Sequence, residues 1–489
     1  MNDAVYAHIH KESMLREPLF SGEKNHLEWV ASRSARFAEE MVPITNADLV
    51  TFARECGKLL GYWHDLGKCS SAFQHYLLTD VDAHALEQRG RVDHSTAGAQ
   101  HAAGTVRGWG TLLAFAIAGH HAGLPDWNGI GDAVLKVRLH KQVESWQERA
   151  PKALLSADGL PPHIPLPVKG FACAFFVRMV FSCLTDADFL ATEAFMNPDQ
   201  SACREKQFPA MARLADHLRT CLEAKFPAVE TAVQRRRQEV LRDCRQATGL
   251  PPGFFSLNVP TGGGKTLSSL AFALEHAARH DLRRVICAIP FTSIIEQNAR
   301  VYREMFDALG EGIVLEHHAN LDPADPQVMD TRLAAENWDA PIIVTTNVQF
   351  FETLFAHRPG RCRKLHRIAR SVIVLDEAQA LPVTLLKPCL AALRELVERY
   401  GCTVVLCTAT QPALQQRENF KIGLTRVRDI ITDATGLHAA LKRVTVADMG
   451  EIFLETSSYQ TGSNGAVDAP RSEIGKLSDL LSTQDGQEL

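Results

Sequence analysis

The stretch VPTGGGKT, residues 259–266, constrains the fold of this chain more than any other feature. It follows the apolar run FFSLNV and precedes TLSSLAFALEHAARH, whose apolar residues recur with helical spacing. Three consecutive glycines between a strand and a helix let backbone N–H groups turn inward around phosphate oxygens. This context predicts a P-loop with the phosphate-binding residues Thr261, Gly262, Gly263, Gly264, Lys265 and Thr266.

The chemistry expected of this P-loop is ATP binding with Mg²⁺. Lys265 is expected to reach the β- and γ-phosphates, and Thr266 to hold the metal. A second motif, VIVLDEAQ at 372–379, is an apolar run that ends in two carboxylates. Asp376 is expected to bind Mg²⁺ through water, and Glu377 to position or deprotonate the attacking water. A purely structural glycine-rich turn is the alternative.

The pattern of apolar residues changes along the chain and predicts more than one domain. The runs RRVICAIP, APIIVTTN, SVIVLDEA and CTVVLCTAT alternate with helix-like stretches, a pattern typical of a parallel sheet covered on both faces. In the first half, apolar residues recur at three and four, and strand-like runs are scarce. We therefore expect an all-α domain at 1–226, a basic helical linker at 227–250, an α/β P-loop domain at 251–446, and a polar, disordered tail at 447–489.

Composition limits the classes of function. The chain has 489 residues and a net charge of −5, so any nucleic-acid surface has to be a local basic patch. Its 12 cysteines show no CxxC pair, which favours a reducing, cytoplasmic environment over a disulfide framework. Neither a signal peptide nor a membrane span is recognisable, so we expect no membrane partner.

The stretch WHDLGK, residues 63–68, predicts metal chemistry in the helical half. His64 and Asp65 are adjacent, so helical periodicity cannot turn both toward one core face, whereas a metal site would use both. Imidazole and carboxylate together suit Mn, Fe, Co or Ni better than Mg. Taken singly, each histidine is more often a core or surface residue. Further candidate ligands lie in the same half of the chain: His26, His94, His120, His121, Asp186 and Asp188.

Helical spacing favours Asp188 over Asp186 as a ligand. Asp188 falls on an apolar stripe, whereas Asp186 falls on the other side with Arg178 and Ser182. The apolar stripe consists of Ala174, Val177, Phe181 and Leu184.

The second half resembles the superfamily 2 helicases. PTGGGKT matches their motif I, IPFTSIIEQNA motif Ia, TTNVQFFETLF motif Ib, DEAQ motif II and TAT motif III. The resemblance implies a RecA-like ATPase lobe that moves along a nucleic-acid strand. Six Lys or Arg residues at 357–370 then represent either phosphate contacts or a solvated face. No arginine-rich QxxGRxxR motif of a second lobe follows, so we expect ATP binding but inefficient hydrolysis and unwinding by this chain alone.

The ordered set H…HD…H…HH…D resembles the HD phosphohydrolase superfamily. That resemblance implies one metal held by His26, His64, Asp65 and Asp188, and a second held by His94, His120 and His121, with Asp65 bridging. It also implies that Asp65 and Lys68 are catalytic, with Lys68 meeting the scissile phosphate and Gly67 allowing a turn. Two metals that share a carboxylate can activate water and stabilise the leaving oxygen of a phosphodiester.

The two halves together resemble the helicase-nucleases of type I CRISPR systems, in stretches such as WHDLGK, DHSTAGA, GHHAGL, PFTSIIEQNA and DEAQAL. This implies a metal-dependent single-stranded DNA nuclease coupled to an ATP-dependent translocase that degrades target DNA. The implied partners are single-stranded DNA and the CRISPR surveillance complex with its guide RNA. Two alternatives stay open: an HD phosphohydrolase acting on nucleotides with an ATP-sensing domain, or a truncated or split subunit that needs a separate chain carrying the second lobe.

Overall fold

The structure of this chain is a computed structural model. It describes residues 4–10, 12–22, 25–79, 93–131, 133–161, 165–166, 170–204, 206–226, 231–318, 328–409 and 414–442. The polar tail predicted at 447–489 lies outside the described residues. The predicted domain boundaries therefore stay predictions, and the packing below shows which elements cover which core.

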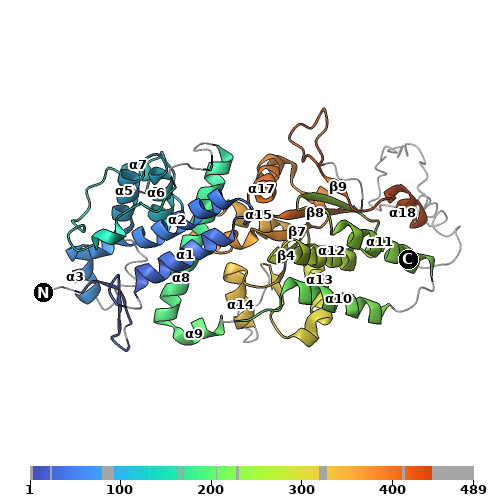
Figure 1. Cartoon of the computed structure of the whole chain (residues 1–489), viewed down its shortest axis with the longest axis horizontal. Helices are drawn as coiled ribbons and strands as arrows, with labels where there is room; N and C mark the ends of the chain where they lie inside the picture. Colours follow the sequence, from blue (N-terminus) through green and yellow to red (C-terminus); the bar gives the residue numbers. More distant parts are fainter. Residues whose placement is uncertain are drawn as a thin grey trace, which may run out of the picture. The chain divides into compact units, whose positions relative to one another are not determined.

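A helical layer makes up most of the first half (Figure 1). Two of its helices start at asparagine caps, since Asn25 and Asn46 accept from the N–H groups of Glu28 at 2.9 Å and Leu49 at 3.2 Å. The helices are α1 (His26–Glu40), α2 (Ala47–Trp63), α3 (Ser71–Thr79), α5 (Ser95–Thr105), α6 (Gly110–Gly119), α7 (Leu135–Arg138), α8 (Phe171–Met196) and α9 (Pro198–Cys203).

A two-stranded antiparallel hairpin precedes these helices and corrects the expectation of helices alone. It consists of β1 (Tyr6–Ile9) and β2 (Arg16–Pro18), with His8 opposite Glu17. Strands of four and three residues are too short to show an alternating pattern in the sequence.

The second half forms one seven-stranded sheet, which confirms the predicted parallel α/β fold. All its pairs are parallel, and the spatial order is β5-β6-β4-β7-β8-β3-β9. The first five of the following strands lie where apolar runs predicted them, while the last two were not predicted. The strands are β3 (Phe254–Asn258), β4 (Arg284–Ile289), β6 (Ile342–Thr346), β7 (Ser371–Leu375), β8 (Thr403–Thr408), β5 (Val314–His317) and β9 (Arg428–Asp429).

Helices cover both faces of the sheet (Figure 1). Along β7, Val372 and Val374 join a core with the helices of one face, whereas Ile373 and Leu375 join a core that continues into the helical layer. The helices of the second half are α10 (Met211–Lys225), α11 (Ala232–Ala247), α12 (Lys265–Arg279), α13 (Thr292–Phe306), α14 (Val328–Asn337), α15 (Asn347–Phe355), α16 (Pro359–Cys362), α17 (Leu386–Glu398) and α18 (Ala434–Ala440).

Helix α10 packs with the sheet, although it lies within the residues 1–226 expected to form the all-α domain. Its apolar side chains Leu214, Leu218 and Leu222 share a core with Leu270 of α12. By side-chain packing, therefore, the helical layer ends before α10 begins.

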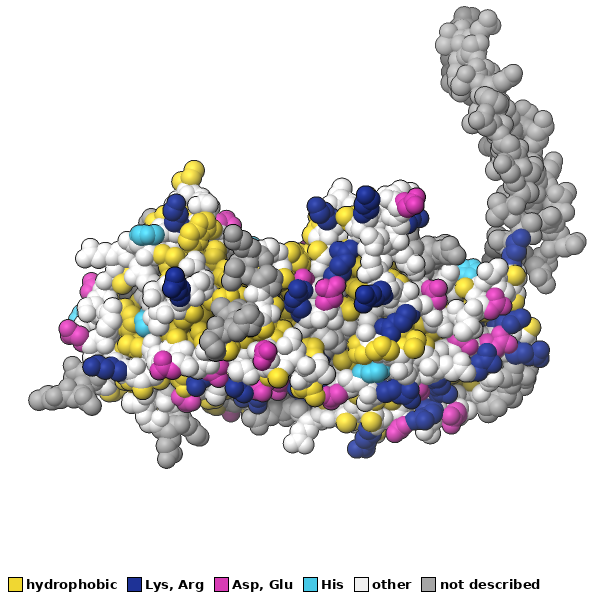
Figure 2. Space-filling view, turned by 45° about the horizontal axis from the view of Figure 1, so that its top comes forward, with side chains coloured by type: hydrophobic (Ala, Val, Ile, Leu, Met, Phe, Trp, Pro, Cys, Tyr) yellow, Lys and Arg dark blue, Asp and Glu magenta, His cyan; other side chains and the backbone are white. Residues whose placement is uncertain are grey.

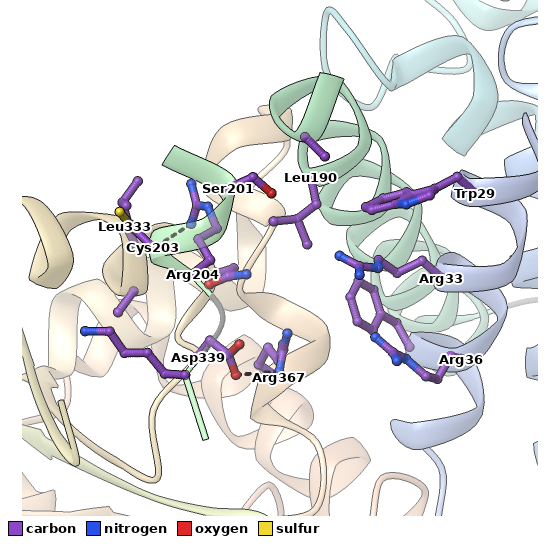
Figure 3. A pocket seen from close by; sticks show the side chains of 15 residues that line it. Trp29, Arg33, Arg36, Leu190, Ser201, Cys203, Arg204, Leu333, Asp339 and Arg367 are labelled. Atoms are coloured by element: carbon purple, nitrogen blue, oxygen red, sulfur yellow. Dashed lines mark hydrogen bonds and ion pairs between the residues drawn. The ribbon is translucent and has the colours of Figure 1, made fainter. Parts of the chain in front are cut away.

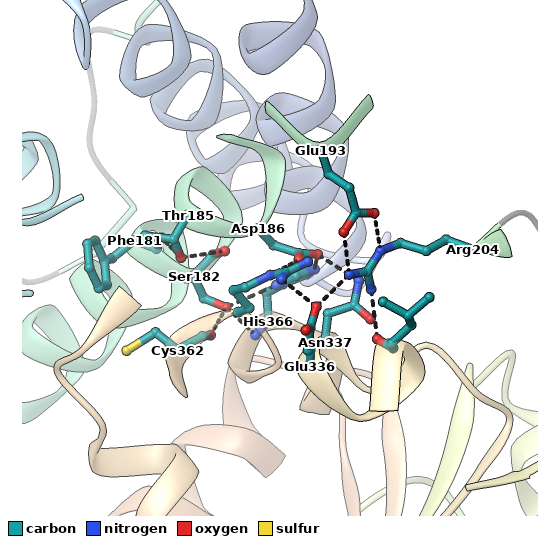
Figure 4. A network of polar contacts seen from close by, with 12 residues as sticks. Phe181, Ser182, Thr185, Asp186, Glu193, Arg204, Glu336, Asn337, Cys362 and His366 are labelled. Atoms are coloured by element: carbon teal, nitrogen blue, oxygen red, sulfur yellow. Dashed lines mark hydrogen bonds and ion pairs between the residues drawn. The ribbon is translucent and has the colours of Figure 1, made fainter. Parts of the chain in front are cut away.

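Helix α8 joins the helical layer to the sheet. Its residue Asp186 is fully buried and accepts hydrogen bonds from Arg363 Nε at 2.9 Å and Asn337 Nδ2 at 3.2 Å (Figure 4). Arg363 also donates to Glu336 at 2.8 Å, and Arg204 donates to the same carboxylate at 2.5 Å. This network pairs buried charges contributed by segments far apart in the sequence, which explains why α8 is buried on both sides.

The basic stretch 357–370 lies mostly inside this interface. Arg363 and Lys364 are buried, and Arg367 is paired with Asp339 at 2.8 Å. Neither expected role, a solvated face or a row of phosphate contacts, describes these side chains. Only two of the six cations are exposed: Arg358 and Arg361.

Charges of both signs are interspersed on the face shown in Figure 2, in line with the small net charge. Among the described residues, no helix combines the length and the apolar character that crossing a bilayer requires.

Candidate metal centre and nucleotide site

A break in helix geometry brings His64 and Asp65 to the same place. Helix α2 ends at Trp63, His64 is its C-cap, and a short 3₁₀ helix begins at Leu66. Because the backbone turns out of the α-helix between these elements, two neighbouring side chains can point into one cluster.

Asp65 stands at the centre of four histidines. Its Oδ2 atom lies 3.4 Å from His26 Nε2 and 3.3 Å from His64 Nε2. Its Oδ1 atom lies 3.3 Å from His94 Nε2 and 3.4 Å from His120 Nε2. Each carboxylate oxygen therefore faces a different pair of imidazoles, an arrangement that can bridge two cations.

Asp188 and His121 complete the two groups. Asp188 Oδ1 lies 3.5 Å from His26 Nε2 and 3.7 Å from His64 Nε2. His121 Nε2 lies 2.8 Å from His94 Nε2, and its side chain is exposed. The structure thus places all seven expected ligands together, while Asp186 points to the interface network.

The histidine tautomers are set by backbone carbonyls. Nδ1 of His64 lies 2.8 Å from the carbonyl of Gly61, and Nδ1 of His120 lies 2.7 Å from that of Ile117. In a neutral ring, the nitrogen that donates to a carbonyl carries the only proton, which leaves Nε2 as the nitrogen that can bind a metal. Both Nε2 atoms therefore point into the cluster as ligands.

The chemistry of these atoms fits divalent cations. Within the described part of the chain, several fully buried polar atoms of the cluster have no hydrogen-bond partner, a costly state unless something binds them. Nitrogen donors with two carboxylates suit Mn, Fe, Co or Ni. The unpartnered atoms are His26 Nδ1, His26 Nε2, His64 Nε2, His120 Nε2 and Asp65 Oδ1.

Charges within the cluster shift the pKa values of Asp65, His64 and His26 in the direction opposite to the effect of burial. Burial alone raises the pKa of Asp65, but the positive charges of His64 and Lys68 hold it well below its ordinary value. Burial alone lowers the pKa of His64, but the adjacent carboxylate raises it to about 9. The pKa of His26 likewise lies well above its ordinary value, because Glu17 and the cluster carboxylates outweigh burial.

Gly67 is required for a close approach rather than for a turn. A Cβ atom at this position would lie 2.2 Å from the backbone oxygen of His94. The absence of a side chain therefore lets the 3₁₀ helix pack directly against the segment that carries one of the ligands.

Lys68 contacts Asp65 from the buried side, and 1% of its side chain is exposed. Its Nζ is 3.0 Å from Asp65 Oδ2, 3.3 Å from the carbonyl of Ala7 and 3.3 Å from His8 Nε2. These contacts match the three donors of an ammonium group, so the charge is directed at the carboxylate that it orients. A contact with a scissile phosphate stays a prediction.

The sequence analysis missed several buried residues around the cluster. Arg138 donates to Thr96 at 2.8 Å, Ser95 at 2.7 Å and the carbonyl of Ala118 at 2.6 Å, and so ties the start of α5 to the end of α6. His8 and Glu17 of the hairpin lie behind His26. The only available signal for these two was an ionisable residue in each of two very short strands.

A cavity of about 330 Å³ lies between α1 and the sheet-side segments (Figure 3). Trp29 and Arg36 line it from α1, the helix that carries His26. Arg36 is exposed and forms no ion pair among the described residues. Arg367 lines the opposite side, where it is paired with an aspartate. Exposed arginine beside an aromatic ring is suited to single-stranded nucleic acid.

The P-loop follows β3 and opens α12. Gly262 and Gly264 have φ values of +82° and +88°, which L side chains rarely adopt. A Cβ at Gly263 would lie 2.6 Å from the side chain of Val259. Arg237 of α11 donates to the carbonyl of Gly262 at 2.8 Å, a support that the sequence analysis missed.

Lys265 bridges the two motif II carboxylates. Its Nζ lies 2.8 Å from Asp376 Oδ1 and 2.5 Å from Glu377 Oε1. Burial lowers the pKa of this lysine, but the charge of Asp376 outweighs it and the net pKa is raised. Glu377 adopts φ +46°, a strained conformation for a non-glycine residue that is characteristic of functional sites.

The expected helicase motifs meet at one edge of the sheet. Motif I follows β3, motif Ia follows β4, motif Ib follows β6 and motif II follows β7, so all lie at the carboxyl ends of parallel strands. Ligands of open α/β sheets bind at this edge. Thr410 of motif III lies outside the described residues.

A histidine–aspartate metal cluster in a helical layer, joined to a P-loop sheet with helicase motifs, defines an HD-type domain fused to a helicase-type ATPase lobe. Comparisons agree. A family model described as the HD domain of Cas3 matches residues 26–159, and one described as DEAD/DEAH box helicase matches residues 236–418.

Similar proteins point the same way. The CRISPR-associated nuclease/helicase Cas3 of Haloferax volcanii is 30% identical over 186 residues, which cover 33% of this chain and 20% of the relative. Crystal structures of T. fusca Cas3 with AMPPNP and with ADP match 83% of this chain and 50% of theirs, at 18% and 19% identity and TM-scores of 0.53 and 0.52. This chain thus spans about half the length of those structures. The chain therefore combines an HD domain of the Cas3 type with a DEAD/DEAH box helicase domain.

Proposed function

We propose that this chain is a metal-dependent nuclease for single-stranded DNA whose cutting is coupled to an ATP-dependent helicase lobe in type I CRISPR interference. The observation that carries the proposal is the convergence of four imidazole Nε2 atoms on the two oxygens of Asp65. The residues that would hold two divalent cations are His26, His64, Asp65, His94, His120, His121 and Asp188. When bound, such cations activate water and offset charge that develops at phosphorus.

The roles of the protein groups follow from their contacts. Asp65 would lie between the cations, held in place by Lys68 at 3.0 Å. The exposed edge of the cluster at His121 would admit the phosphodiester. The cavity with Trp29 and Arg36, on the helix that carries His26, would offer stacking and phosphate contacts to a single strand.

At the second site we propose ATP with Mg²⁺. Lys265 would exchange its two carboxylate partners for the β- and γ-phosphates, which releases Asp376 for Mg²⁺ and Glu377 for the attacking water. Efficient hydrolysis further needs an arginine from a second lobe, whose source would be a separate chain or a segment outside the described residues. Recruitment to DNA would depend on a CRISPR surveillance complex with its guide RNA.

The test uses circular single-stranded DNA with Mn²⁺, Ni²⁺ or Mg²⁺ and no ATP. We expect cleavage with the transition metals, loss of cleavage in Asp65→Ala, and wild-type cleavage in Lys265→Ala, because the P-loop does not contribute to the metal cluster. Mononucleotides are assayed in parallel. Metal-loaded protein that leaves DNA intact but hydrolyses nucleotides would overturn the proposal in favour of a nucleotide phosphohydrolase.

A further inference from the structure

The N-terminal hairpin forms a second layer behind the metal cluster. His8 of β1 and Glu17 of β2 are directly opposite each other in the strand register. His8 Nδ1 lies 2.6 Å from Glu17 Oε2, and the two side chains are 5% and 12% exposed. The other carboxylate oxygen of Glu17 lies 3.5 Å from His26 Nδ1.

His26 differs from the other ligands in how its ring is supported. His64 and His120 each donate Nδ1–H to a carbonyl three residues earlier. His26 is the first residue of α1, so no earlier helical turn lies behind it. Its Nδ1 faces Glu17 instead, and its Nε2 faces the cluster. A carboxylate behind a histidine ligand fixes the tautomer and raises ligand basicity in metalloproteins.

The contacts form a directed chain of donors and acceptors. Lys68 has only donors, so its contact with His8 Nε2 at 3.3 Å makes that nitrogen the acceptor. His8 Nδ1 then carries the proton and donates to Glu17. The other oxygen of Glu17 makes an ion-pair contact of 3.5 Å with His26 Nδ1, which has no hydrogen-bond partner among the described residues, so Glu17 faces the proton that this nitrogen carries. Each link therefore favours a proton on His26 Nδ1, so Nε2 is the nitrogen that can bind a metal ion once its own proton is displaced.

The hairpin is fastened to the site by Gln74 of α3. Its amide donates to the carbonyl of Tyr6 at 2.8 Å and to that of Lys68 at 2.9 Å, and its oxygen accepts from the N–H of Tyr6 at 3.0 Å. Strand β1 thus has a fixed position relative to the residue that orients Asp65.

We propose that Glu17, clamped by His8, is a positioning residue that holds His26 as a metal ligand. This rests on the proposed two-metal centre but concerns metal binding, which can be measured without DNA. A protein that binds two metals and cuts nothing would defeat the proposed nuclease function and leave this inference standing.

The test titrates chelator-stripped full-length protein with Mn²⁺ by calorimetry. We expect two Mn²⁺ ions per wild-type chain. In Glu17→Ala, one of them should bind 10- to 100-fold more weakly while the other keeps its affinity, the size of effect typical for such supporting residues. The near-isosteric Glu17→Gln keeps one acceptor oxygen and should lose less affinity than Glu17→Ala. His8→Ala should fall between Glu17→Gln and wild type.

Controls separate positioning from general damage. Glu12→Ala changes an exposed glutamate in the same hairpin and should bind both ions normally. Asp65→Ala should weaken both. The visible spectrum of the Co²⁺-loaded protein should change in Glu17→Gln and stay unchanged in Glu12→Ala. Wild-type affinity for both ions in Glu17→Ala would overturn the inference. So would a third Mn²⁺ that is lost in that variant, since His8, Glu17 and His26 would then be a ligand set themselves.

Discussion

At the scale of single residues, the metal cluster holds an ionised carboxylate and protonated imidazoles together in a buried place. Asp65 stays ionised although it is buried, and His64, with its pKa raised to about 9, is protonated at neutral pH in the metal-free protein. His26, with its pKa also raised, is protonated as well. These protons stand where cations would bind, so metal binding has to displace them.

We therefore predict that metal binding releases protons and strengthens as pH rises from 6.5 to 9. His64 has a folded-state pKa above its unfolded value of 6.5, so its contribution to the stability of the metal-free protein is complete below pH 6.5. This contribution of His64 is lost as pH rises through about 9. Over the same range the proton on His64 no longer competes with the metal. Calorimetric titration with Mn²⁺ at pH 7, in buffers of different ionisation enthalpy, measures the release. Binding without proton release at pH 7 would contradict the assignment.

At the scale of elements, α8 shows how far sequence reasoning reaches. Helical spacing alone separated Asp188 from Asp186, because the two faces of one helix repeat every 3.6 residues. It could not reveal the partner of Asp186, since Arg363 lies 177 positions away in the chain. The role of the hairpin was not predicted for a related reason. The position of Glu17 beside His26 depends on a contact between separate elements rather than on any local sequence pattern.

The interface network yields a stability prediction. Arg363→Met leaves the buried carboxylate of Asp186 without its guanidinium partner and should lower the free energy of unfolding by about 3–5 kcal/mol. The double variant Asp186→Asn/Arg363→Met should recover part of this loss, because no buried charge is left unpaired. Urea denaturation measures both.

The matched control for this pair is Arg361→Met, an exposed arginine of the same segment, which should change stability by less than about 0.5 kcal/mol. Asp186→Asn should also retain both Mn²⁺ ions, since its side chain faces away from the cluster. Loss of an ion in that variant would show that the two faces of α8 are not independent.

At the scale of the whole molecule, the helical layer and the sheet share one core within residues 1–441. The same apolar cluster contains Leu60 and Phe176 of the helical layer and Ile373 and Val404 of the sheet. The buried ion pair between Arg363 and Asp186 crosses the same interface. Opening one part would expose apolar surface and unpaired charge on the other, a combination that favours unfolding as one cooperative unit.

This shared core predicts that a metal bound in the helical layer protects the sheet. At a free Mn²⁺ concentration of 100 times Kd, binding adds about 2.7 kcal/mol to the stability of the folded state. Amides of β7 and β8 that exchange only through global unfolding should then exchange about 100-fold more slowly, as should those of α2. Hydrogen exchange followed by mass spectrometry measures both sets in one experiment. Asp65→Ala should show no slowing in either set, whereas slowing confined to α2 in the wild type would mean that the two parts unfold independently despite their common core.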